Sequence, residues 1–117
     1  FEELGIRHYL CRIIRPWDLE KVLENAVYIK LRMMGYNVYV GQFEGKEIDF
    51  VAKRGDEMAY YQVSLQISNS ETYEREFGNL KLIKDNYPKY VITMDALASL
   101  SNDDGIRVLP AGDFLLN

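Results

Sequence analysis

The chain has 117 residues, 48% of them hydrophobic, which favours one globular domain over a disordered segment. Its formal net charge of -4 is atypical of a general nucleic-acid-binding domain, although a local basic patch is compatible with it. The single cysteine, Cys11, excludes an internal disulfide and a cysteine-rich zinc site, and no apolar run is long enough to span a membrane. Because the chain begins at Phe1 with no initiator methionine or signal peptide pattern, we expect a piece of a longer, cytoplasmic protein.

The first clear element is a helix over residues 15–36, after a short apolar stretch at 5–14 that is either a strand or an extended lead-in. Asp18 suits the N-terminal cap or first turn, and Gly35 suits the C-terminal stop. Winding at about 100° per residue places Glu24 at the edge of a broad apolar arc. That arc consists of Leu19, Val22, Leu23, Ala26, Val27, Leu31, Met33 and Met34.

The rest of the chain alternates between strand patterns and one more helix. Residues 36–43 alternate like a strand, and residues 46–67 form a β-hairpin. A second helix is predicted over 70–87, followed by a buried strand at 89–95 and then a short strand with an ordered tail at 105–116. The order of helix, three strands, helix and strand predicts a mixed sheet with helices packed on it.

The turn of the hairpin sets which residues oppose one another. If Gly55-Asp56 form the two central residues of a type II′ turn, Arg54 opposes Glu57 and, further out, Asp49 opposes Gln62. Side chains alternate between the faces of a sheet. One face then collects the polar residues Glu47, Asp49, Gln62, Ser64 and Gln66. The other face, predicted to be core, collects Ile48, Phe50, Tyr61, Val63 and Leu65.

The polar face of this hairpin has two interpretations. It is either the solvated outer face of an antiparallel sheet, which is a common arrangement, or a site for a cation or phosphate. Mg²⁺ prefers oxygen ligands, usually one or two carboxylates with waters. Asp49, the amide oxygen of Gln62 and the carbonyl of Val63 offer such oxygens, and Glu24 can join them if the first helix packs nearby.

The combination of Glu24 on a helix, "EIDF" with Asp49, and "YYQVS" with Gln62 and Ser64 resembles the PD-(D/E)xK nuclease superfamily. The phrases "LENAVYIKLRMMGYNVYVG", "EIDFVA", "YYQVSLQI", "ERE" and "IKDNYPKYVITMD" look more closely like the C-terminal domain of a prokaryotic AAA+ ATPase family. The resemblance spans residues 4–117 and implies an α/β restriction-endonuclease-like αβββαβ core in a single domain over residues 1–117. It also implies an N-terminal ATPase module that binds ATP; this chain contains no Walker A motif.

The resemblance assigns roles to individual residues. It implies that Glu24, Asp49 and Gln62 stand where active members of the superfamily hold Mg²⁺, and that Ser64 stands at the position of the catalytic lysine. Gln62 lacks the charge of a carboxylate, and Ser64 supplies no positive charge for the transition state. Lys81 on the second helix is the best candidate for a substitute lysine.

We therefore expect an accessory nuclease-fold domain with a degenerate active site, which binds nucleic acid such as DNA, a protein partner or its own ATPase module. One alternative is an active Mg²⁺-dependent DNA or RNA phosphodiesterase. The other is an oligomerisation scaffold that forms a homo-oligomer. No membrane partner is expected. Lys81, Lys84 and Lys89 form a modest basic cluster with little affinity for phosphate.

Overall fold

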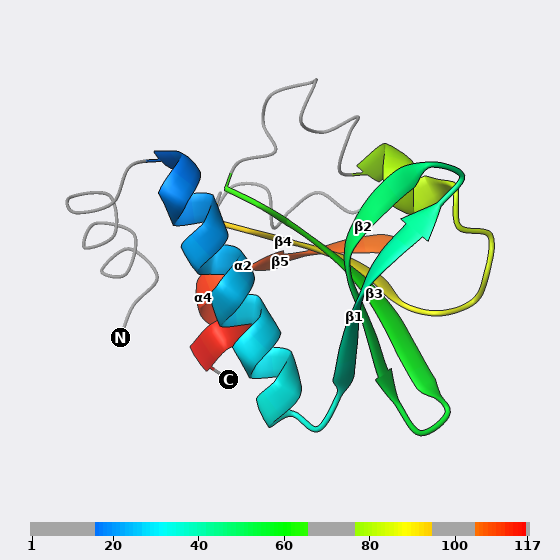
Figure 1. The fold of residues 1–117 in the computed structure, drawn as a ribbon, viewed down its shortest axis with the longest axis horizontal. Helices are drawn as coiled ribbons and strands as arrows, with labels where there is room; N and C mark the ends of the chain where they lie inside the picture. The colour runs from blue at the N-terminus through cyan, green and yellow to red at the C-terminus, as the bar shows by residue number, and fades with distance from the viewer. Residues whose placement is uncertain (1–15, 66–76, 95–104, 117) are drawn as a thin grey trace.

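A computed structural model describes residues 16–65, 77–94 and 105–116 of the chain. These residues form a five-stranded mixed sheet flanked by helices, as the sequence predicts (Figure 1). The expected lead-in at 5–14 lies outside the described residues. In the described part of the chain, no helix is both long enough and apolar enough to cross a membrane.

Helix α2 (Pro16–Met33) is the long helix predicted at the start of the chain. It ends just before Gly35, whose φ of 93° is the left-handed conformation that favours glycine at a helix end. Its buried side chains follow a four-residue spacing: Leu19, Leu23, Val27 and Leu31. Met33, predicted on the apolar arc, is instead 77% exposed, because it lies about 200° around the helix from Leu31.

The strands lie in the sheet in chain order. They are β1 (Asn37–Phe43), β2 (Lys46–Arg54), β3 (Glu57–Ser64), β4 (Lys89–Thr93) and β5 (Ile106–Pro110). The first three strands are antiparallel neighbours, whereas β3 pairs with β4, and β4 with β5, in parallel. The predicted hairpin register is confirmed from Arg54 opposite Glu57 to Phe50 opposite Tyr61, where the backbone pairing of β2 with β3 ends.

Helices cover both faces of the sheet (Figure 1). Helix α4 (Ala111–Leu116) follows β5 and lies beside α2 on one face. Residues 77–81 on the other face are helical and belong to the predicted second helix, which ends earlier than the sequence suggested. The start of that predicted helix lies outside the described residues.

The two core layers define the faces of the sheet. The first core, under α2, contains Leu23, Val27, Leu31, Ala52, Ala59, Tyr61, Val63, Ile92, Met94 and Ala111. The second core, under the segment 77–83, contains Ile48, Tyr60, Phe77, Leu80, Ile83, Val91, Ile106 and Val108. Ile48 therefore packs on the face opposite Phe50, Tyr61 and Val63, and its predicted place beside them is wrong.

Candidate functional site

A β-bulge in β2 explains the position of Ile48 and places Asp49. On β1, Tyr39 pairs with Val51 and Gly41 pairs with Ile48, so two residues of β2, Asp49 and Phe50, stand opposite one residue of β1. A bulge of this kind shifts the alternation of side chains by one residue. Because of the bulge, the side chain of Ile48 packs in the second core. Asp49 is part of the bulge, so its side-chain direction does not follow the regular alternation of the strand.

Beyond the bulge, β2 and β3 are connected by side chains. The backbone pairing reaches Phe50 opposite Tyr61. One step further, the backbone N–H of Asp49 donates to the Oε1 atom of Gln62 at 2.7 Å, and the backbone N–H of Val63 donates to the Oδ2 atom of Asp49 at 2.9 Å. We call this region, from Glu47–Asp49 on β2 to Gln62–Ser64 on β3, the fork. In the fork, Asp49 and Gln62 supply acceptors that backbone carbonyls supply in a regular ladder.

The amide nitrogen of Gln62 extends the same network to the neighbouring layer. Its Nε2 atom donates to the carbonyl of Glu47 at 3.4 Å, and the Nδ2 atom of Asn79 donates to that carbonyl at 3.1 Å. Asn79 belongs to the helical segment 77–81. Asn79 was not identified from the sequence. The available signal is its position directly before the buried Leu80, which places a polar side chain next to the core.

Gln62 and Ser64 are buried, with 2% and 3% of their surfaces exposed. They alternate along β3 with Tyr61 and Val63, which belong to the first core, so they face the second layer. The interpretation of this face as a solvated surface is therefore wrong for these two residues. Burial of an amide is tolerable here because both of its polar atoms are hydrogen-bonded.

The surroundings of Asp49 are acidic. Burial raises the pKa of Asp49 from 3.8 to about 6, the hydrogen bond from Val63 opposes this rise, and the charges of Glu24, Glu47 and Glu20 add to it. Burial, followed by the charge of Glu20, also raises the pKa of Glu24. The structure thus brings Glu24 of α2 within electrostatic range of Asp49.

Lys81 lines a different part of the surface. It borders a cavity of about 370 Å³ together with Lys84, Asp85 and Lys89. Asn79, two residues earlier on the same helical segment, is the residue that contacts Glu47 in the fork. Residues two positions apart in a helix lie about 200° apart around its axis, so Lys81 points away from the side of the segment on which Asn79 contacts the fork.

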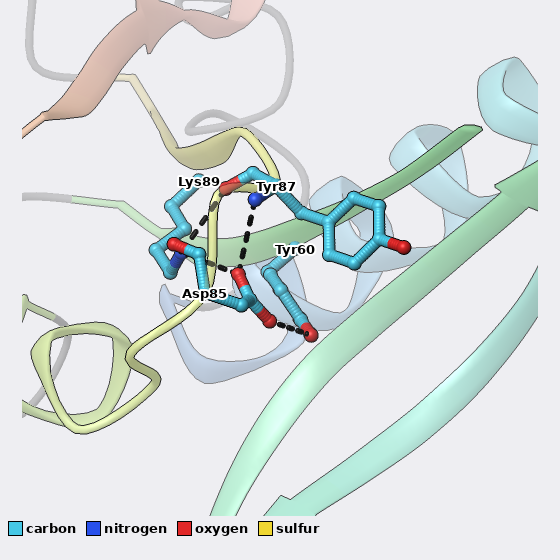
Figure 2. A network of polar contacts seen from close by, with 4 residues as sticks. All are labelled: Tyr60, Asp85, Tyr87 and Lys89. Atoms are coloured by element: carbon cyan, nitrogen blue, oxygen red, sulfur yellow. Dashed lines mark hydrogen bonds and ion pairs between the residues drawn. The ribbon is translucent and has the colours of Figure 1, made fainter. Parts of the chain in front are cut away.

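A second polar network, which sequence reasoning missed, surrounds Asp85 (Figure 2). Its carboxylate accepts hydrogen bonds from the Tyr60 hydroxyl at 2.6 Å, from the Lys89 ammonium at 2.8 Å and from the Tyr87 backbone N–H at 3.1 Å. Burial acts to raise the pKa of Asp85, but the hydrogen bonds from Lys89 and Tyr60 hold this pKa below its usual value. The run "KDNYP" in the sequence is a turn signal that marks Asp85.

The residues of the fork fit the Mg²⁺ ion implied by the resemblance only in part. The carboxylates of Asp49 and of the nearby Glu24 fit it by charge, because a cation offsets the repulsion from neighbouring glutamates, which adds to the rise that burial causes in both pKa values. Gln62 fits it less well, because its amide oxygen already accepts the N–H of Asp49. Among the described residues, no three His, Cys, Asp or Glu side chains form a group that could hold a metal ion.

Comparison with known proteins gives one relative. Over 94 residues the chain is 45% identical to an uncharacterized protein of Haemophilus influenzae. The match covers 80% of this chain and 22% of the relative, so the chain spans under a quarter of that protein's length. No protein-family model matches the sequence, and no solved structure matches it.

Proposed function

We propose that the chain is an accessory domain with a restriction-endonuclease-like αβββαβ core and a degenerate active site, which acts by binding rather than by cleaving phosphodiesters. The observation that carries this proposal is the engagement of Asp49 and Gln62 with the opposing backbone at 2.9 and 2.7 Å. Two side chains at positions of the superfamily motif act here as structural acceptors. Ser64, at the lysine position, brings no positive charge to the fork.

In this proposal the domain belongs to a longer cytoplasmic AAA+ ATPase, and its partner is a protein, either the ATPase module or another chain. The match to 22% of a longer relative supports a domain within a larger protein. The acidic surroundings of Asp49 support a protein partner over nucleic acid, because the charges of Glu20, Glu24 and Glu47 repel phosphates. Nucleic-acid binding without cleavage is the alternative, and a cleavage assay combined with salt-dependent binding distinguishes it from a protein partner.

The second candidate function is an active Mg²⁺-dependent phosphodiesterase. The raised pKa of Asp49, about 6, favours it, because carboxylates with perturbed pKa values cluster at catalytic sites. Incubation of the protein with plasmid DNA or RNA and Mg²⁺ or Mn²⁺ distinguishes the candidates. We expect no cutting beyond that of Asp49→Ala. Cutting that Asp49→Ala abolishes would refute the degenerate site, whereas salt-dependent binding without cutting would assign a nucleic-acid partner.

The structural role of Gln62 has its own test. Gln62→Leu keeps a side chain of similar size but leaves the backbone N–H of Asp49 without its acceptor. We expect a loss of about 1–3 kcal/mol in the free energy of unfolding and faster amide exchange at Asp49. Gln62→Glu retains an acceptor oxygen, so it serves as the matched variant and should preserve the slow exchange. Equal exchange in the wild type and Gln62→Leu would contradict the structural role.

A further inference from the structure

Strand β1 is an edge strand with an unusual composition. It lies at one end of the sheet order, and alternate N–H and C=O groups of an edge strand point away from its neighbour. Its sequence, NVYVGQF, contains no charged residue and no proline. The opposite edge, β5, carries Arg107 and Pro110 and leads directly into α4, features that hinder strand addition. The two edges differ, and β1 is the one suited to accept another strand.

The side chains at the centre of β1 are exposed on both faces of the sheet. Tyr39 is 54% exposed and Val40 is 69% exposed. Consecutive residues of a strand point to opposite faces, so the helical layers leave both faces of this edge open. Among the described strands, none pairs with the outer side of β1. Large apolar side chains exposed beside such an edge are typical of a surface that another strand covers.

A cavity lies beside the same strand. Its volume is about 350 Å³, and its mainly apolar lining includes Gly41, Phe43, Ile48 and Val51, with Asp85 among the polar residues. Gly41 keeps β1 close to β2 at this point, because a Cβ atom there would lie 2.7 Å from the Cγ2 atom of Val51. Tyr39 pairs with Val51 and Gly41 pairs with Ile48, both residues that pack in or against the second core. Tyr39, Gly41 and the cavity are therefore on the same face.

We propose that β1 pairs antiparallel with β1 of a second copy of this chain, with the two Val40 residues opposite each other on a two-fold axis. Centring on Val40 is the arrangement that pairs all seven residues of the strand. It places Tyr39 of each copy opposite Gly41 of the other, on the face where the cavity lies. The Tyr39 ring enters the cavity of the other copy and covers its edge glycine, a recognised cross-strand arrangement.

The charges also favour a second copy as the occupant. Identical strands bring identical side chains together, and a charged residue near the centre would meet its own copy. β1 avoids this repulsion, although the whole chain has a net charge of -4. The paired sheets form one continuous ten-stranded sheet across the axis, with the five described strands of each copy on either side. This surface does not depend on the nuclease-like function proposed above.

Light scattering after size exclusion, over a dilution series, tests the proposal. We expect the wild type to have the mass of two copies, and Val40→Lys to have the mass of one, because two ammonium groups would face each other across the axis. Val40→Glu should also be monomeric, and an equimolar mixture of the two variants should regain the mass of two copies. Ile29→Lys, at a site on α2 that is 56% exposed, is the matched control and should stay dimeric.

Tyr39→Ala tests the cavity separately from the strand pairing. Loss of a ring that is buried in the dimer should weaken the dimer at least about tenfold in Kd. Circular dichroism of Val40→Lys checks that the exposed substitution leaves the fold intact. A wild type that is monomeric at every concentration, a dimer that survives Val40→Lys, or mixed variants that stay monomeric would each overturn the proposal. Monomers that instead bind an unrelated β-strand peptide would assign the edge to a different partner.

Discussion

Asp49→Asn should stabilise the protein at neutral pH and leave it unchanged in acid. The asparagine side chain retains an oxygen that can accept the hydrogen bond which Val63 donates to Asp49 at 2.9 Å. It removes the negative charge that burial and the neighbouring glutamates disfavour. The substitution therefore isolates the cost of the charge from the loss of the hydrogen bond.

The size and direction of the effect follow from the pKa of Asp49. In the folded state this pKa is about 6, against 3.8 without the fold, so the folded protein holds the proton more tightly. Stability is then highest below the lower value and falls as the pH rises from about 4 to about 6, because the unfolded chain ionises first. The shift corresponds to about 3 kcal/mol, an upper value because Asp49 is not fully buried.

Urea unfolding of the wild type and Asp49→Asn at a series of pH values measures this cost. The stability difference between the two proteins should be near zero at the acid end, grow as the pH rises to about 6, and stay constant above it. Asp56→Asn, in the exposed hairpin turn, is the matched control and should give a difference that does not vary in this way. Two results would show that the surroundings of Asp49 do not oppose its charge. One is a stability difference between the wild type and Asp49→Asn that does not change with pH, and the other is a wild type that is more stable than Asp49→Asn at pH 8.

Three further substitutions test the packing around the second core. Asp85→Ala should lower the free energy of unfolding by about 3 kcal/mol, because Lys89, only 8% exposed, loses its ion-pair partner, whereas Tyr60→Phe should cost about 1 kcal/mol. Urea unfolding ranks the two, and the reverse order would contradict the network. Gly41→Ala should cost about 1–3 kcal/mol, since its Cβ atom would lie 2.7 Å from Val51, and an unchanged urea midpoint would show that β1 and β2 separate easily here.

The register of the hairpin followed from the sequence because local turn chemistry determines it. A turn of Gly55-Asp56 fixes the opposition of Arg54 and Glu57, and the pairs outward as far as Phe50 and Tyr61 follow by counting. The φ of 59° at Gly55 is the left-handed conformation that such a turn requires. The same counting placed Asp49 opposite Gln62. The backbone pairing ends one step earlier, and the two residues are instead joined by a hydrogen bond of 2.7 Å from the Asp49 N–H to the Gln62 side chain.

The bulge that follows was not predictable by the same reasoning. The two-residue turn at Glu44-Gly45 fixes the pairs from Phe43–Lys46 to Gly41–Ile48, but the bulge lies beyond them, where no turn residue marks the extra residue of β2. Counting with strict alternation placed Ile48 on the same face of the sheet as Phe50. The extra residue that the bulge adds to β2 shifts the alternation, so that Ile48 lies in the second core instead. The hydrogen bonds from Asn79 to Glu47 and from Tyr60 to Asp85 were hidden for a related reason, because the partners are 32 and 25 residues apart in the sequence.

The cost of the charge at Asp49 bears on what the fork does. For a purely structural acceptor, asparagine performs the same role without the penalty, so an aspartate that lowers stability at neutral pH is better explained by a use for its charge. If the active site is degenerate, as proposed, the negative charge of Asp49 must serve to recognise a partner. Asp49→Asn should then gain stability and lose affinity for that partner together. A variant that gains stability and keeps full affinity would leave the charge without a role in binding, and the fork would be structural alone.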